Sequence, residues 1–261
     1  MRSLHAEWTK LRTLQSTWWL LAATVALTVA AGAAAVSSVT PGVCPSPRAC
    51  HEDTVKLGLT GIWLGQATVL VLGALSMGAE YGTGTIGATL TAMPDRRKTL
   101  LAKAAALSLP TAAAATAAVL AVLGAARLIL PANGFEPSTG YPLPTLTDGP
   151  TLRAATGTVL CLVLVALLGL ALAVLLRDTA GAITVGLGIL YVVPLMARLL
   201  HSPTWQHRLE RWTPMPAALS IQATRDLDRL PIAPWPGLGV LAAYALALSL
   251  LGAAAFGRRD A

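Results

Sequence analysis

Six long, largely apolar segments without a single acidic residue restrict the fold of this chain more than any other feature. They span residues 18–37, 58–78, 104–130, 154–176, 180–200 and 237–256. A helix needs ~20 largely apolar residues to cross a hydrocarbon core of ~30 Å. The basic residues within these segments, Arg127 and Arg198, lie near segment ends, where their side chains can reach the membrane interface. The sequence therefore predicts an all-α integral membrane protein with six transmembrane helices.

Charged residues make up only 12% of the chain, whereas globular domains contain about 25%. This scarcity argues against a soluble globular protein, and we expect residues 1–261 to form a single transmembrane domain. A net charge of +7 would indicate nucleic-acid binding in a soluble protein. In a membrane protein, excess Lys and Arg instead mark the cytoplasmic segments. We therefore predict no nucleic-acid partner and a lipid bilayer as the surroundings.

The orientation follows from the distribution of positive charge, because an even number of spans places both termini on one side. With the N-terminus inside, ten of the nineteen basic residues are cytoplasmic: Arg2, Lys10, Arg12, Arg96, Arg97, Lys98, Lys103, Arg177, Arg258 and Arg259. The inner segments are much shorter than the outer ones and are therefore richer in positive charge. The prediction is that both termini are cytoplasmic.

Two outer segments carry distinctive residues. Cys44 and Cys50 lie in the first outer loop, where a disulfide is feasible in an oxidising compartment, and two unpaired thiols are the alternative. The loop 201–236 is rich in Trp and Pro. We expect one or two short helices there that dip into the outer interface, either as a lid over an exit or as an ordered loop without a gating role.

Residues 1–17 are predicted to form an amphipathic helix in the cytoplasmic interface, running into the first span. Apolar residues recur there at helical spacing, while Glu7 and Lys10 lie three apart on a more polar face. The residues assigned to this interfacial helix are Glu7, Trp8, Lys10 and Arg12. The alternative is a charged tail that only orients the chain.

The segment 79–103 joins the second and third spans on the predicted cytoplasmic side. Thr83 or Thr85 can cap a short helix that Pro94 ends, and Asp95 can cap the third transmembrane helix. The short helix is expected to expose Ile86, Leu90 and Met93. Such a coupling helix could dock into a groove on a soluble partner, whereas a basic interfacial loop is the alternative. The residues assigned to coupling are Glu80, Tyr81, Thr85, Ile86, Leu90, Met93, Pro94, Arg96, Arg97 and Lys103.

The second span contains small residues at spacings that allow another helix to approach closely. Gly61 and Gly65 form a small-x-x-x-small pair, and Gly73 lies further along. Helix packing is one interpretation of these residues. The other is a transport pathway or dimer seam, to which Gln66 would contribute polarity.

Motifs for nucleotide, metal or catalytic chemistry are weak or missing. Gly82, Gly84 and Gly87 spell G-x-G-x-x-G, but that motif binds dinucleotides only between a strand and a helix of a soluble unit. The sequence contains no G-x-x-x-x-G-K-[ST], no H-E-x-x-H and no G-x-S-x-G. We therefore predict that the chain is not an enzyme, and we assign no catalytic, cofactor-binding or metal-binding residue.

Several short motifs occur in a characteristic order along the chain. The N-terminus reads Ala6-Glu7-Trp8-Thr9-Lys10-Leu11-Arg12-Thr13, followed by Ser16-Thr17-Trp18-Trp19. After the second span come Glu80-Tyr81, Gly84-Thr85-Ile86 and Leu90-Thr91-Ala92, then Pro94, Arg96 and Lys103. The motif Arg258-Arg259-Asp260 lies near the end of the sequence. Taken together with six spans, this order resembles actinobacterial type-2 ATP-binding-cassette (ABC) transporter permeases.

The resemblance implies a permease of the bacterial plasma membrane that pairs with a second permease copy, as a homodimer or a related heterodimer. It also implies two cytosolic ATPase subunits, contacted by the N-terminal helix and by residues Glu80 through Lys103. The implied function is export of a small molecule, drug, lipid or peptide, driven by ATP hydrolysis in the separate subunit. The alternative is a non-transporting membrane scaffold or sensor that recruits a cytosolic partner.

Overall fold

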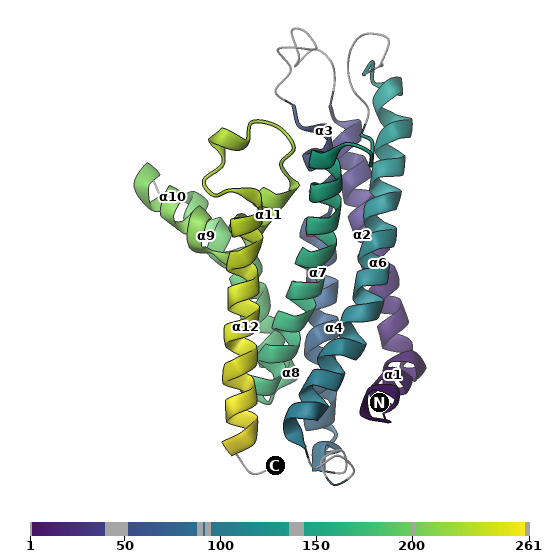
Figure 1. Ribbon diagram of the computed structural model, residues 1–261, viewed down its shortest axis with the longest axis vertical. Helices are drawn as coiled ribbons and strands as arrows, with labels where there is room; N and C mark the ends of the chain where they lie inside the picture. The colour runs from purple at the N-terminus through teal and green to yellow at the C-terminus, as the bar shows by residue number, and fades with distance from the viewer. Residues whose placement is uncertain are drawn as a thin grey trace.

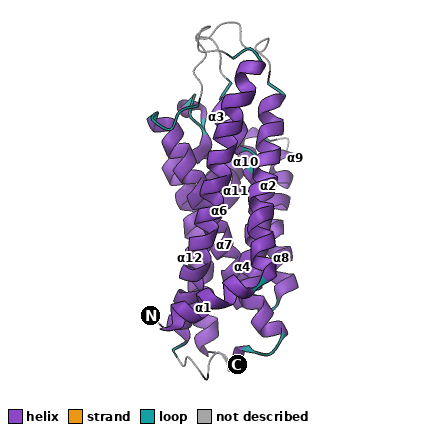
Figure 2. Ribbon diagram, turned by 90° about the vertical axis from the view of Figure 1, so that its right-hand side faces the viewer, coloured by secondary structure: helices purple, strands orange, loops and turns teal. Residues whose placement is uncertain are grey.

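The computed structural model describes residues 2–39, 52–87, 91, 95–135, 144–199 and 202–258. Throughout these residues the regular structure is helical, and Figure 2 shows helices and loops without a strand. Six helices in this part of the chain are long and apolar enough to cross a membrane. They are Gln15–Ser37, Thr54–Gly82, Arg97–Ala132, Gly149–Leu176, Thr179–Met196 and Pro234–Phe256. The predicted six transmembrane helices are confirmed, and their length and composition make the chain a multi-pass membrane protein.

Helix α7 (Gly149–Leu176) occupies the middle of the bundle (Figure 1). It is the most apolar of the six spans, which allows it to be surrounded by other helices without burying unpaired polar groups. Helices α4 (Ile62–Gly82), α6 (Arg96–Ala132) and α12 (Pro234–Arg258) pack directly against it. Helix α2 (Gln15–Ser37) packs against α4 and α6.

Glycines bring α4 into close contact with its neighbours. A Cβ added at Gly73 would lie 2.0 Å from the carbonyl oxygen of Ala166 on α7. A Cβ at Gly61, just before α4, would lie 2.0 Å from the carbonyl oxygen of Thr28 on α2. These contacts agree with the packing interpretation. Gly61, Gly65 and Gly73 are buried against α2 and α7 of the same chain.

The fifth span is irregular. It consists of α8 (Thr179–Leu187), a π-helical stretch (Gly188–Val192) and α9 (Val193–Leu199). Pro194 lies at the second residue of α9 and has no backbone N–H to donate to the preceding turn. A π-helical turn next to this proline accommodates the missing hydrogen bond.

The segment after the fifth span folds into short helices. They are α10 (Pro203–Trp212), α11 (Pro214–Leu219) and two 3₁₀ turns (Ser220–Gln222 and Leu227–Arg229). In Figure 1, α10 extends away from the bundle while α11 lies against α12. Helix α11 begins with Pro at its first position, where a missing N–H costs nothing.

Part of this segment is anchored inside the bundle. The side chains of Met215 and Ile221 are fully buried. Gln222 is also buried, and its Nε2 donates hydrogen bonds to the Leu59 carbonyl oxygen at 3.2 Å and to the Thr158 hydroxyl at 3.3 Å. These contacts tie the stretch around Gln222 to α7 and to the short helix α3 (Thr54–Leu59).

Asp53 provides a second anchor for the same segment. Its carboxylate caps α3 by accepting a hydrogen bond from the Lys56 backbone N–H at 2.9 Å. It also accepts one from the Thr224 hydroxyl at 2.8 Å and others from the backbone N–H groups of Thr224 and Arg225. One carboxylate therefore holds together segments that are 171 residues apart.

Replacing Asp53 by Ala should lower the free energy of unfolding by about 2 kcal/mol, because a helix cap and charge-assisted hydrogen bonds are lost together. Thermal unfolding in detergent and proteolysis near residue 225 would measure the effect. Asp228→Ala, at an exposed site in the same segment, is the control. Equal unfolding temperatures for the two variants would contradict the anchoring role.

Helix α1 (Arg2–Thr13) lies at an angle to the bundle, beside the ends of α2 and α6 (Figures 1 and 2). It ends at Thr13 rather than at the expected residue 17, because Leu14 is extended and α2 starts at Gln15. The described end of α12 lies at the same end of the molecule as α1 (Figure 1). We call this end of the bundle the α1 end.

Helices α4 and α6 both extend beyond their predicted spans at the α1 end. Helix α6 already begins at Arg96, where the Asp95 carboxylate accepts a hydrogen bond from the Lys98 N–H, as predicted for a cap. Thr83 ends α4 rather than starting a new helix, and its hydroxyl donates to the Ala79 carbonyl oxygen. The expected exposure of Ile86 is wrong, because this side chain is 8% exposed and packs into the main hydrophobic core.

Candidate functional site

Two carboxylates and two ammonium groups meet at the α1 end, and we call Glu7, Lys10, Glu80 and Lys103 the four-charge cluster. Lys103 is at its centre and is 2% exposed. Its Nζ lies 2.8 Å from Oε2 of Glu7 and 2.6 Å from Oε1 of Glu80. The Ser76 carbonyl oxygen is a further acceptor at 3.5 Å. The three protons of the ammonium group therefore have three acceptors.

Lys10 completes the four-charge cluster from its outer side. Its Nζ lies 3.0 Å from Oε1 of Glu80 and 3.5 Å from Oε1 of Glu7, and its side chain is 45% exposed. Partial burial acts to lower the pKa of Lys10, but the hydrogen bond to Glu80 and the charges of both carboxylates outweigh it. The pKa of Lys10 therefore lies above its ordinary value.

Three separate helices contribute to the four-charge cluster. Glu7 and Lys10 lie three residues apart on one face of α1, Glu80 lies near the end of α4, and Lys103 lies near the start of α6. Glu7 is only 3% exposed, so the pair with Lys103 is largely shielded from solvent. Removing one partner of a buried ion pair typically costs about 3–5 kcal/mol. The four-charge cluster therefore fixes α1 to the ends of α4 and α6.

Sequence reasoning singled out all four residues but did not bring them together. Glu7 and Lys10 were assigned to the interfacial helix, and Glu80 and Lys103 to the coupling segment. One signal in the sequence could have predicted their contact: two acidic and two basic residues flank apolar spans on the same predicted side of the membrane. Their burial was not predictable, because Glu80 and Lys103 lie outside the predicted apolar spans 58–78 and 104–130.

The other assigned residues near the α1 end have different surroundings. Tyr81 lies under the guanidinium group of Arg177, whose central carbon is 5.8 Å from the ring centroid, and this contact links α4 to the end of α7. Thr85 is exposed, and its hydroxyl lies 2.9 Å from that of Thr83. Arg97 is exposed on α6.

Trp8 and Arg12 both belong to α1. Trp8 is half-buried beside α6, and the Arg12 carbonyl oxygen accepts a hydrogen bond from the Trp18 indole N–H at 2.9 Å. This bond spans the break at Leu14 and fixes the angle between α1 and α2.

Several assigned residues lie outside the described residues. They are Leu90, Met93, Pro94, Cys44 and Cys50. Arg96 begins α6, but its side chain also falls outside the description. The middle of the predicted coupling helix and the proposed disulfide therefore stay predictions.

Gln66 differs from the glycines with which it was grouped. Its side chain is completely buried within the second span, on the side of Tyr191. A part-buried hydroxyl pair also joins α2 and α4, with the Thr24 and Thr68 oxygens 2.7 Å apart. Polar contacts between spans hold helices together, and a buried amide in a span also marks a candidate pathway residue.

In the part of the chain that the structure describes, no group of three or more His, Cys, Asp or Glu side chains could hold a metal ion. Comparison of the sequence with models of known protein families and with curated proteins finds no match. The class of the molecule is therefore defined by its fold and site: a multi-pass membrane protein with a charge cluster around a buried lysine, formed by three helices.

Proposed function

We propose that this chain is the membrane-spanning permease subunit of an ABC exporter that moves a small molecule, drug, lipid or peptide. The main support is the four-charge cluster, in which Glu80 and Lys103 of the segment 79–103 meet Glu7 and Lys10 of α1. A partner that displaces this segment would move two spans and α1 as one unit. Such rigid transmission is what an energy-coupling connection requires.

The proposed cycle uses a cytosolic ATPase subunit as the source of motion. Closure of two ATPases on ATP displaces the segment 79–103, which continues directly into α4 and α6. The displacement shifts the bundle between inward- and outward-facing states, and ATP hydrolysis resets it. This chain supplies no catalytic group to that reaction.

The proposal also fixes orientation and assembly. The α1 end faces the cytoplasm of a bacterial cell, where the basic residues around it face the partner. Two permease copies, identical or related, pair with two ATPase subunits. Because Ile86 is buried, contact with the ATPase falls on exposed positions of the segment such as Thr85 and Thr91.

Purification of the intact protein from its native membrane tests this proposal. An ATPase should co-purify, and Thr85→Arg should reduce transport per ATP hydrolysed severalfold, because a long cation is placed in the contact. Thr147→Arg is the matched control, since Thr147 is exposed and lies in the loop before α7. Co-purification of a protein without ATPase activity would instead favour the scaffold or sensor function.

A further inference from the structure

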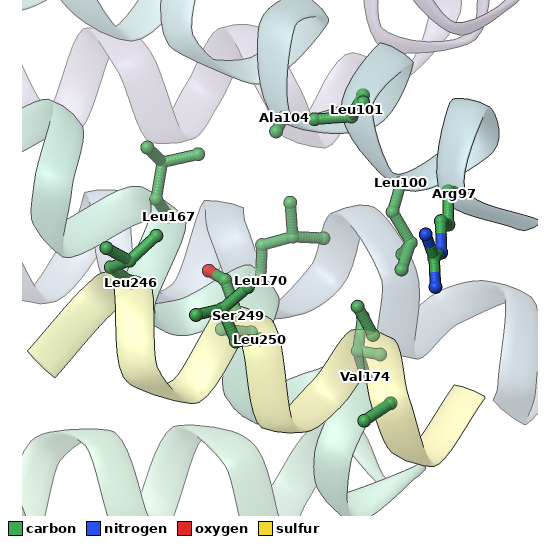
Figure 3. A pocket seen from close by; sticks show the side chains of 13 residues that line it. Arg97, Leu100, Leu101, Ala104, Leu167, Leu170, Val174, Leu246, Ser249 and Leu250 are labelled. Atoms are coloured by element: carbon green, nitrogen blue, oxygen red, sulfur yellow. The ribbon is translucent and has the colours of Figure 1, made fainter. Parts of the chain in front are cut away.

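An apolar groove runs between α6 and α12, with α7 as its floor (Figure 3). Its volume is about 500 Å³. Leucine side chains from all three helices line it, including Leu100, Leu170 and Leu250. Ser249 is the one neutral polar side chain among the lining residues.

Among the described residues, Arg97 is the charged side chain that lines this groove. Arg97 lies at one end of it, while Leu167 and Leu246 lie at the other (Figure 3). The guanidinium group is exposed and makes no ion pair within the described residues. The neighbouring Lys98 differs, because its Nζ is 2.9 Å from the Asp95 carboxylate, and this hydrogen bond helps to lower the pKa of Asp95.

The two ends of the groove correspond to the two parts of a lipid molecule, its charged headgroup and its acyl chain. Arg97 precedes the predicted apolar span 104–130 on α6, so we expect its guanidinium group to lie outside the hydrocarbon, on the side of the lipid headgroups. The rim further along is apolar and open to hydrocarbon, with Leu101 70% exposed and Leu250 62% exposed. Basic pockets between transmembrane helices bind acidic headgroups, and Arg forms two parallel hydrogen bonds with phosphate.

We propose that this groove binds one acyl chain of an anionic phospholipid whose phosphate pairs with Arg97. The positive guanidinium group favours a headgroup with a net negative charge over a zwitterionic headgroup that also contains a phosphate, while the leucines accommodate the acyl chain. This site requires no ATPase and does not depend on the proposed transport function.

Native mass spectrometry of the full chain, released from detergent with defined lipids, tests the site. The probes are phosphatidylglycerol and phosphatidylcholine with identical acyl chains. We expect about tenfold preferential retention of phosphatidylglycerol, the effect of one charge-assisted interaction. Arg97→Gln should abolish this preference, whereas the control Lys98→Gln should keep it.

A second variant addresses the apolar part of the groove. Leu250→Trp should reduce retention of both lipids, because the larger side chain fills the space beside Leu170. Equal retention of both lipids by the unmodified protein, or an unchanged preference in Arg97→Gln, would overturn the proposal. A dimer in the mass spectrum that disappears in Leu250→Trp, with no change in lipid retention, would also overturn the proposal. A second copy of the protein would then occupy the groove. Complete displacement of the lipid by inorganic phosphate would show that the acyl chain contributes nothing to binding, and this result would also overturn the proposal.

Discussion

Replacing Lys103 by Met should lower the free energy of unfolding by about 3 kcal/mol, because Glu7 and Glu80 then remain buried without their central cation. Breaking a buried ion pair typically costs about 3–5 kcal/mol, and we expect the lower end of that range because Lys10 still contacts both carboxylates. Denaturant titration of the purified protein in detergent would measure it. Lys98→Met is the control, because the pair between Lys98 and Asp95 is exposed and should contribute little.

A double-mutant cycle separates the ion pair from general damage. Glu7→Gln and Lys103→Met, made singly and together, should show an interaction energy of about 1–3 kcal/mol. Proteolysis within α1 should accelerate in either single variant, because α1 loses its attachment to α6. Additive effects, or a Lys103→Met protein as stable as Lys98→Met, would show that the four-charge cluster does not hold the helices together.

Replacing Gly73 by Val should destabilise the protein by about 3 kcal/mol or more, since an overpacked helix contact cannot relax without moving a backbone. The Cβ alone would lie 2.0 Å from the Ala166 carbonyl oxygen, far inside van der Waals contact. Even Gly73→Ala should therefore be strongly destabilising. Expression level and thermal unfolding in detergent would report the effect.

Gly124→Ala provides the matched control for this prediction. Gly124 also lies inside a transmembrane helix, but a Cβ there meets no atom within 4 Å. Because Ala is the better helix former, this variant should be neutral or more stable by up to ~1 kcal/mol. Similar losses for Gly73→Ala and Gly124→Ala would mean that the α4–α7 contact is looser than described.

The sequence predicted the spans well because membrane crossing depends on local composition. Length and apolarity decide whether a helix can lie in hydrocarbon, and both are properties of consecutive residues. The Asp95 cap was predictable for the same reason, since capping acts over three residues. The break between α1 and α2 was less predictable, because the helix expected over residues 1–17 ends at Thr13 and Leu14 is extended.

Features that join distant residues were not predictable in this way. Spacing favoured an exposed Ile86, yet the fold turns this side chain into the core. The glycines of the second span fitted both an internal contact and a dimer seam, and only the tertiary structure shows them buried against α2 and α7.

The sequence by itself thus determined the class of the protein: six helices in a membrane, with charge confined to their ends and connections. Only the tertiary structure decided that Glu7, Lys10, Glu80 and Lys103 meet in one cluster around a buried Lys103, and that Arg97 lies at the end of an apolar groove. The physical reason is that hydrophobic transfer depends on each segment alone, whereas an ion pair depends on the distance between two groups. Lys103 and Glu7 are 96 residues apart along the chain, and their 2.8 Å contact exists only after α1 has packed against α6.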